Sequence, residues 1–545
     1  MSSTNVIVIG GGHNGLVTAA YLAKAGRATL VLERRDEVGG AAVTGEIAPG
    51  FRSSTLAHAA GPLRPAIARD LGLAGHGLEL LAPDPPVVAL DPDGRALAFH
   101  RDPHVTARGL AELSVRDAAR YPAFADVLAT LGGFLRPLLD EAPPSIDRPA
   151  GRDLWSLLKA GRRFRALGRE NGFRLLRYMP MGVADLVDEW LETGLARAAV
   201  AARGIAGTAL GPRAAGTGAN LLLAAAADPA PAGGASFVRG GLGALTAALA
   251  AAARAAGAKI RTGAEVARVL VRDGRAAGVI LATGEEIPAA AVVSNADPVR
   301  TLLGLVDPDA LEPEFAERVR HYRAHGAAAK VNLALDRLPT FTALARHERP
   351  EAWLAGRLHI GPDLDYLERA ADAAKYGECS AEPYLDVAIP SIADPSLAPP
   401  GRHVVSVYVQ FTPYRLRGRE WAAERDALAD LVVRTLARYA PDLPDLVLAR
   451  QIITPADLET EYGLTGGHVL HGDPALDQLF VSRPLFGWAR YRTPIEGLYL
   501  CGAGTHPGGG VTGAPGANAA REILRDLRAR RRSPSTPHTK TRRVT

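Results

Sequence analysis

The chain begins with a strand, a glycine-rich turn and a helix, and this arrangement constrains its fold more than any other feature. Residues 6–9 are an unbroken run of valine and isoleucine, which is typical of a strand buried on both faces. The following turn contains Gly10, Gly12 and Gly15, and a helical pattern continues to Gly26. In this G-x-G-x-x-G spacing the glycines permit a tight bend, a close approach to a pyrophosphate, and close packing of helix on strand. The sequence therefore predicts a dinucleotide-binding unit.

An acidic residue completes this motif. A second strand-like run, residues 29–32, ends in Glu33, about 20 residues after the glycines, where an acid bonds to the ribose of a dinucleotide. The N-terminus of the intervening helix offers N–H groups and a positive dipole end to the phosphates. An acid at position 33 disfavours a 2′-phosphate, and so NADP. The motif leaves the choice between NAD and FAD open.

A second glycine-rich segment lies near the C-terminus. Residues 497–501 are predicted to form a strand, residues 502–516 are rich in glycine, and a helical pattern resumes at Asn518. A strand, a glycine-rich loop and a helix again present backbone N–H groups to a flat or anionic ligand. A small-residue turn at residues 39–42 also lets the chain pass close to a long cofactor.

These segments resemble a known family. The stretches VIGGGHNGL, VLERRDEVGGAAVT and GLYLCGAGTHPGGGVTGAPGANAA are similar to the carotenoid (phytoene) desaturase-like flavoproteins, within the wider amine-oxidase-like FAD superfamily. The resemblance is strongest to the branch called pyridine nucleotide-disulfide oxidoreductase domain-containing protein 2, and it includes AKVNLALDRLP and ITPADLE. It implies non-covalently bound FAD, a split FAD-binding domain and an inserted substrate domain.

The resemblance also implies which residues hold FAD. Its flavin end would lie beside Gly502, Val511 and Thr512, and the backbone of Val266 would contact the adenine. The residues that would hold the ADP half are Gly10, Gly12, Gly15, Glu33, Arg34, Gly40 and Ala41.

The word disulfide in that branch name does not fit this sequence. A disulfide reductase needs a close thiol pair, whereas Cys379 and Cys501 are far apart in the sequence. It also needs a second G-x-G-x-x-G for a nicotinamide nucleotide, and we find none. We therefore expect FAD as the one nucleotide, and no metal, because no histidine or cysteine cluster has a ligand spacing.

The predicted fold class is α/β, with a split Rossmann-like FAD-binding domain of the glutathione reductase and amine oxidase type and an inserted α+β substrate domain. We expect residues 76–231 of the insertion to be mostly helical. The alternation at residues 403–411 predicts a sheet half-covered by helices. The predicted boundaries are 1–75, 232–300 and 485–528 for the FAD-binding domain, 76–231 and 301–484 for the substrate domain, and 529–545 for a disordered basic tail.

Two residues are candidates for catalysis. Lys330 opens a strand, on the face opposite Val331, and a similar lysine in amine-oxidase relatives holds a water near flavin N5. An equally weighted alternative is that Lys330 lies at the end of the strand and is exposed to solvent. His506 lies in the second glycine-rich loop, where it would act as an acid or base near neutral pH, or else bond to the backbone.

The predicted function is an FAD-dependent oxidoreductase. It would remove hydrogens from an apolar or amine-type small molecule and pass electrons to oxygen, a quinone or another acceptor. One alternative is a carotenoid (phytoene) desaturase, although residues 512–514 depart from the Pro-Gly usual in those enzymes. Another alternative is a flavin-bound regulatory or binding protein with little turnover.

The charge distribution argues against a nucleic-acid partner. The net charge is +5, but residues 521–545 contain nine basic and two acidic side chains, so the rest of the chain is close to neutral. No signal peptide and no membrane-spanning run is visible in the sequence. We expect a cytoplasmic protein, with a peripheral contact to the inner membrane surface left open. The sequence does not indicate an oligomeric state.

Overall fold

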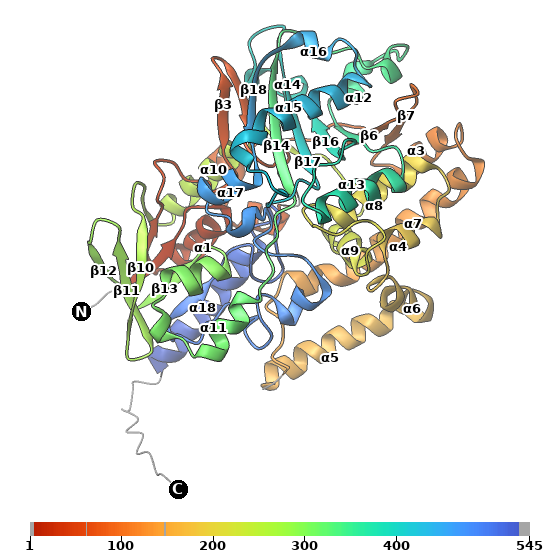
Figure 1. The fold of residues 1–545 in the computed structure, drawn as a ribbon. Coiled ribbons are helices and arrows are strands. Elements are labelled where there is room, and N and C mark those ends of the chain that lie inside the picture. Colours follow the sequence, from red (N-terminus) through yellow and green to blue (C-terminus); the bar gives the residue numbers. More distant parts are fainter. Residues whose placement is uncertain (1–4, 62, 147–148, 533–545) are drawn as a thin grey trace.

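Two large sheets organise the molecule, and helices surround them (Figure 1). The computed structural model describes residues 5–61, 63–146 and 149–532. Within these residues, no helix is both long and apolar enough to cross a membrane.

The first sheet has five strands, and every neighbouring pair is parallel. Its strands come from three separate segments that lie within 1–75, 232–300 and 485–528, the parts predicted to form the FAD-binding domain. In spatial order the strands are β19 (Leu498–Leu500), β13 (Ala291–Ser294), β1 (Asn5–Ile9), β2 (Ala28–Leu32) and β9 (Lys259–Arg261).

Both faces of this sheet are buried, as the apolar run of its first strand predicts. Val6 and Val8 pack against α1 (His13–Lys24), α10 (Leu242–Ala255) and α18 (Ala514–Arg532). Ile7 and Ile9 point to the opposite face. There they pack against a three-stranded antiparallel sheet of β10 (Val266–Arg272), β11 (Arg275–Leu281) and β12 (Glu286–Pro288).

The N-terminal helix α1 and the C-terminal helix α18 approach each other very closely. A side chain at Gly516 would place its Cβ 2.3 Å from the carbonyl oxygen of Asn14, so only glycine fits there. Thr18 Oγ1 lies 3.1 Å from the carbonyl oxygen of Gly516 and donates to that of Asn14 at 2.8 Å. The second glycine-rich loop therefore leads into a helix, α18, that packs directly on α1 of the first motif.

The second sheet has seven strands and is mostly antiparallel. On one face, alternate residues of its central strands pack against α15 (Trp421–Ala437) and α16 (Leu443–Leu446). Its opposite face is buried too, in its central part against the two-stranded sheet of β3 (Thr44–Ala48) and β4 (Phe51–Ser54) and not against helices. In spatial order the strands are β18 (Val447–Ile453), β14 (Ala328–Leu335), β17 (His403–Gln410), β16 (Leu385–Ala388), β15 (Arg357–Ile360), β6 (Val87–Leu90) and β7 (Ala96–Phe99).

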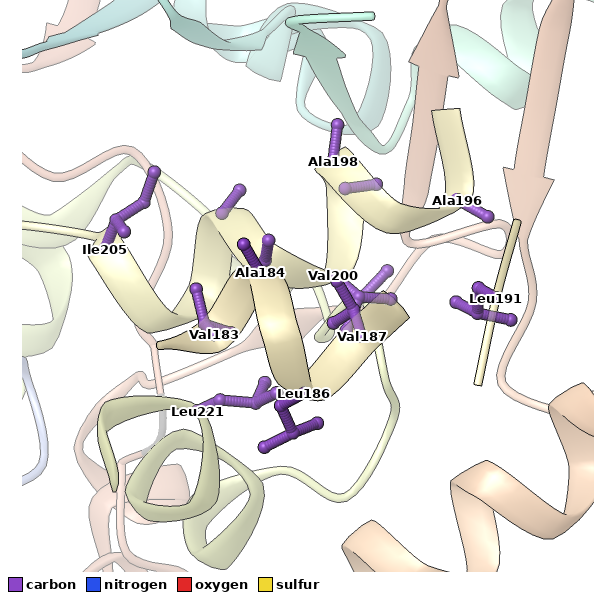
Figure 2. Packing of buried hydrophobic residues seen from close by; sticks show 14 of the residues in the cluster. Val183, Ala184, Leu186, Val187, Leu191, Ala196, Ala198, Val200, Ile205 and Leu221 are labelled. Carbon is purple, nitrogen blue, oxygen red and sulfur yellow. The ribbon is translucent and has the colours of Figure 1, made fainter. Parts of the chain in front are cut away.

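Seven helices follow β7, and six of them pack in a cluster that covers one end of this sheet. Figure 2 shows their apolar contacts, in which Val187 lies beside Val200 and Leu186 beside Leu221. The segment is mostly helical, as expected, although the short strands β6 and β7 precede these helices and extend the seven-stranded sheet. The helices are α3 (Pro103–Leu110), α4 (Val115–Leu139), α5 (Gly151–Ala166), α6 (Gly168–Tyr178), α7 (Val183–Asp188), α8 (Gly194–Ile205) and α9 (Thr217–Ala227).

The predicted disordered tail, residues 529–545, begins too early. Helix α18 continues to Arg532, so the first part of that segment is helical. The rest, residues 533–545, lies outside the described residues.

Candidate active site

A cavity of about 360 Å³ lies at the carboxyl ends of β1, β2 and β13, where ligands bind in open parallel sheets. Tyr408 of β17, in the seven-stranded sheet, also lines it. The cavity therefore touches both sheets. We call the part around Gly10, Glu33 and Arg34 the nucleotide end.

The first glycine turn forms the floor of the nucleotide end. Gly10 has a positive φ of 91°, which turns the chain sharply after β1. Gly12 is the N-cap of α1, so the N-terminus of that helix faces the cavity. Gly15 does not line the cavity; a Cβ there would lie 2.2 Å from the carbonyl oxygen of Gly10. Gly15 thus acts by close packing, as the motif predicts.

Glu33 ends β2 and lines the cavity while being almost completely buried. Its Oε2 accepts a hydrogen bond of 2.7 Å from the backbone N–H of Gly11. Its Oε1 lies 3.1 Å from the backbone nitrogen of Arg35 and accepts from it. These bonds fix the carboxylate at the point where an acid receives ribose hydroxyls.

Arg34 and Arg35 close the nucleotide end. The guanidinium of Arg34 donates to the carbonyl oxygen of Glu461. Arg35 donates to the carbonyl oxygen of Gly40 at 2.6 Å and lies over the ring of Tyr462, 5.2 Å from its centroid. Predicted cofactor-binding residues that line this part of the cavity are Gly10, Gly12, Glu33, Arg34, Gly40, Ala41 and Val266.

The second glycine loop contributes one of its three predicted residues to the lining. Val511 lines the cavity, whereas Gly502 and Thr512 do not. A Cβ at Gly502 would lie 2.4 Å from the carbonyl oxygen of Asn295, so this glycine permits close contact between strand ends. Thr512 instead accepts a backbone hydrogen bond of 3.1 Å from Arg64.

Unsatisfied polar atoms show that the cavity suits a polar ligand. Within the described residues, three buried atoms of its lining have no hydrogen-bond partner: His13 Nε2, Asn14 Oδ1 and His471 Nδ1. Buried polar groups are rarely left without a partner, and a bound molecule with phosphate or hydroxyl groups would supply one. The glycine floor, the Glu33 carboxylate and these atoms together fit the ADP half of FAD.

Lys330 does not line the cavity itself but is buried directly behind residues that do. It lies on β14 opposite Tyr408, which lines the cavity, and none of its surface is exposed. Its Nζ lies 3.0 Å from Nδ1 of His58, and the neighbours of His58 in the chain, Ala57 and Ala59, line the cavity as well. The solvated alternative is therefore excluded. Within the described residues, no carboxylate lies within ion-pairing distance of this ammonium.

A chain of charged groups continues behind Lys330. Nε2 of His58 lies 3.7 Å from Oδ2 of Asp386, and the same oxygen accepts a bond of 2.5 Å from Arg357. We call Lys330, His58 and Asp386, with the cavity wall beside them, the lysine end.

Burial controls protonation at the lysine end. It lowers the pKa of Lys330 from 10.5 to about 7, although Asp386 pulls the pKa upward. Burial, and then the charge of Lys330, lowers the pKa of His58 to about 4. Burial opposes ionisation of Asp386, but Arg357 and His58 outweigh it and hold its pKa below the usual range. Near neutral pH, Lys330 therefore exchanges a proton beside a neutral imidazole.

His506 has a different position from the one expected. It is buried but does not line the cavity, and its Nε2 lies 3.0 Å from the carbonyl oxygen of Leu138. Its own carbonyl oxygen accepts a bond of 2.8 Å from the Tyr491 hydroxyl. Burial lowers the pKa of His506 to about 4. These contacts match the alternative of a loop histidine bonded to the backbone.

Several lining residues were absent from the predicted set. Asn295 follows β13 as Glu33 ends β2, so the rule that sites form at strand ends could have found it. Arg300, Tyr408 and His471 carry no comparable signal, because they reach the cavity only through the tertiary fold.

Comparison with known proteins finds relatives that are similar along most of the chain. A family profile described as flavin containing amine oxidoreductase matches residues 15–524. Pyridine nucleotide-disulfide oxidoreductase domain-containing protein 2 of Rattus norvegicus is 39% identical over 544 residues, covering 96% of this chain and 94% of its own. A limonene dehydrogenase subunit of Castellaniella defragrans is 29% identical over 554 residues, covering 96% and 95%. The phytoene desaturase (lycopene-forming) of a Paracoccus species is 30% identical, covering 54% and 56%.

Solved structures confirm the fold class. An oxidoreductase from Methanosarcina mazei superimposes with a TM-score of 0.59 at 20% identity, covering 96% of this chain and 100% of its own. A putrescine oxidase bound to putrescine gives a TM-score of 0.59 at 16% identity, covering 97% and 99%. The resemblance stated from the sequence and the assignment of FAD as cofactor are likewise confirmed.

Proposed function

We propose that this chain, which belongs to the flavin-containing amine oxidoreductase family, dehydrogenates an apolar, uncharged small molecule. It is an FAD-dependent oxidoreductase, so the electrons removed from the substrate pass to the flavin and onward to oxygen, a quinone or another acceptor. The observation that supports this chemistry is the buried amine of Lys330, paired across the sheet with Tyr408 of the cavity lining.

Lys330 has the properties of a proton acceptor at the reacting end. Dehydrogenation removes two electrons and two protons from the substrate, and bound FAD supplies the group that takes a hydride equivalent. The second proton needs a base whose pKa lies near the working pH. Lys330, with its pKa lowered to about 7 by burial, meets this requirement directly or through a water that it holds.

The charges around the cavity favour an uncharged substrate. The acidic residues of its lining, Glu33, Glu265 and Glu461, all belong to the nucleotide end, where they surround Arg34. Lining residues near or opposite the lysine end are instead apolar or uncharged: Leu56, Ala57, Ala59, Ala206, Gly207 and Tyr408. An ammonium substrate would meet no carboxylate there, and it would lie near a group that is itself cationic below about pH 7.

Two relatives bear on the substrate class. The relative named as a limonene dehydrogenase component is similar along 96% of this chain, and limonene is an uncharged hydrocarbon. The phytoene desaturase covers only 54% of the chain, and residues 512–514 depart from the Pro-Gly usual in carotenoid desaturases. We therefore place a long polyene second to a smaller apolar substrate.

Anaerobic bleaching of the yellow flavin absorbance tests the proposal. The FAD-loaded enzyme would be mixed with a neutral monoterpene, a carotenoid precursor, or an aliphatic amine such as putrescine or cyclohexylamine. We expect bleaching by the neutral terpene class and none by the amines. Bleaching by amines alone would overturn the substrate class, and bleaching by phytoene alone would favour the desaturase.

A further inference from the structure

Helix α5 makes unusually little contact with the rest of the molecule. Of its sixteen residues, only Asp153 is buried. Figure 1 shows α5 at the edge of the structure, remote from both large sheets. A helix in a folded domain normally buries an apolar stripe, so the position of the apolar side chains on α5 needs another explanation.

Contacts near both ends hold one face of α5 against the body, besides ion pairs of Arg152 with Glu522 and of Lys159 with Glu141. In the first turn, both carboxylate oxygens of Asp153 accept from Arg490, at 3.2 and 3.3 Å. In the last turn, Phe164 meets the ring of Phe134 edge-on, with the centroids 6.0 Å apart. Asp153 and Phe164 are eleven residues apart, or about three helical turns, so they share one face.

Three large apolar side chains lie away from that face. Trp155 is about half a turn round the helix from Asp153 and is 65% exposed. Leu154 and Leu158, one turn apart, are 57% and 55% exposed. Leu157, which is 44% exposed, is four residues after Asp153 and so lies on the anchored side. We call Leu154, Trp155 and Leu158 the α5 apolar face. Exposed clusters of large apolar side chains mark interaction surfaces.

Basic side chains lie beside the α5 apolar face and continue it toward the C-terminal end of the helix, since Arg162 is one turn beyond Leu158. The helix carries five basic residues and one acid, Asp153, whose carboxylate already binds Arg490. Arg162, Arg163 and Arg165 form no ion pair with any carboxylate of the described chain. Tryptophan and leucine on one side of a helix, with arginine and lysine beside them, suit the boundary between lipid headgroups and acyl chains.

We propose that α5 docks on an anionic phospholipid membrane, with Trp155, Leu154 and Leu158 inserted at the interface and the arginines on the headgroups. The helix would lie in the plane of the surface, held at both ends by Asp153 and Phe164. This docking is independent of the chemistry at the lysine end. It would be weakened by salt, because the arginine contribution is screened.

Vesicle sedimentation of the full-length, FAD-loaded protein tests the docking. Vesicles would contain phosphatidylcholine with an equal amount of phosphatidylglycerol, or phosphatidylcholine alone. We expect binding to the anionic vesicles and at least about tenfold weaker binding to the neutral ones. The double variant Trp155→Ser, Leu158→Ser should weaken binding about tenfold or more, and Arg162→Gln with Arg163→Gln should remove most of the salt dependence.

A matched control comes from another exposed leucine. Leu448 is 50% exposed on β18, and Figure 1 shows β18 at the end of the molecule opposite to α5, so Leu448→Ser should bind vesicles as the unchanged protein does. The flavin spectrum and the melting temperature would show that each variant is folded. Equal binding by the α5 variants and the unchanged protein would overturn the proposal and assign any binding to another basic segment, such as residues 533–545. A dimer that dissociates in the double variant, with no vesicle binding, would overturn it in favour of a second copy of the chain.

Discussion

At the nucleotide end of the cavity, the first glycine turn, Glu33 and Arg34 follow one another within a short stretch of chain. Most of the groups that this stretch presents to a ligand belong to the backbone. At the lysine end, Lys330, His58 and Asp386 come from three distant segments, and they contribute side chains that can bind or release a proton. The first region is a conformation that a local motif can specify. The second is an environment that exists only after folding. The two regions should therefore respond to substitution in different ways.

The largest effect should follow a change at the packed glycine of the nucleotide end. Gly15→Ala would place a Cβ 2.2 Å from the carbonyl oxygen of Gly10. Both atoms are fixed to the backbone, so this clash cannot be relieved without moving β1 or α1. We expect a loss of about 3 kcal/mol or more in unfolding free energy, with loss of bound FAD. Denaturant unfolding followed by circular dichroism measures the change.

Gly133→Ala is the control for that substitution. Gly133 lies in α4, and a Cβ there would meet nothing within 4 Å. Its effect should stay within about 1 kcal/mol. Equal stability of the Gly15 and Gly133 variants would contradict the close-packing role.

At the lysine end, Lys330→Met should separate chemistry from cofactor binding. Methionine has a similar length and suits burial, so the fold and the flavin spectrum should be retained. We expect the rate of anaerobic flavin bleaching to fall about 100-fold or more. Stopped-flow absorbance measures this rate, and Lys375→Met, at an exposed lysine of α13 (Leu364–Lys375), is the control. An unchanged rate in the Lys330 variant would remove this residue from the mechanism.

Glu33→Gln should have the opposite effect to Lys330→Met: FAD binding should weaken while the chemistry is retained. The variant keeps the shape of the side chain but loses a charged acceptor that binds the N–H of Gly11 at 2.7 Å. We expect the dissociation constant for FAD to rise about tenfold while the bleaching rate of the loaded enzyme changes little. Fluorescence titration of the apoprotein with FAD measures the affinity. Glu37→Gln, at an exposed acid in the next loop, should leave it unchanged.

The smallest effect should be a pH dependence confined to the lysine end. Lys330 is a base only when deprotonated, so the bleaching rate should rise with pH through a midpoint of about 7 and then level off. His58, with a pKa of about 4, should add no step in this range. Rates measured from about pH 6 to about pH 9 define the curve. The residual rate of Lys330→Met should be flat, and a sloping residual rate would assign the titration to another group.

Much of the nucleotide end could be predicted from the sequence. The spacing of the glycines indicates where the chain must turn, and runs of β-branched residues indicate which strands are buried. Thus Gly10, Gly12 and Glu33 of the motif all line the cavity, as does Val266, which the family resemblance implies. The same reasoning identified the strand that carries Lys330 and its face, because strand periodicity is a local property.

The lysine end could not be predicted to the same depth. His58 follows no motif, and its contact with Lys330 joins residues 272 positions apart in the chain. Whether Lys330 was solvated or buried depended on that contact and not on its strand. His506 shows the converse, since a histidine within a glycine-rich loop suggested chemistry, yet the fold turns it toward the carbonyl oxygen of Leu138.

The contact between Gly516 and α1 has a consequence for how the enzyme matures. The helix that forms the floor for the cofactor phosphates packs on a helix that the ribosome makes 498 residues later, and the edge strand β19 also comes from that late segment. A nascent chain therefore exposes an unfinished nucleotide fold until this segment emerges. FAD should be captured only after α18 has left the ribosome, and a chain truncated before residue 514 should accumulate as an aggregation-prone species however well its N-terminal motif is preserved.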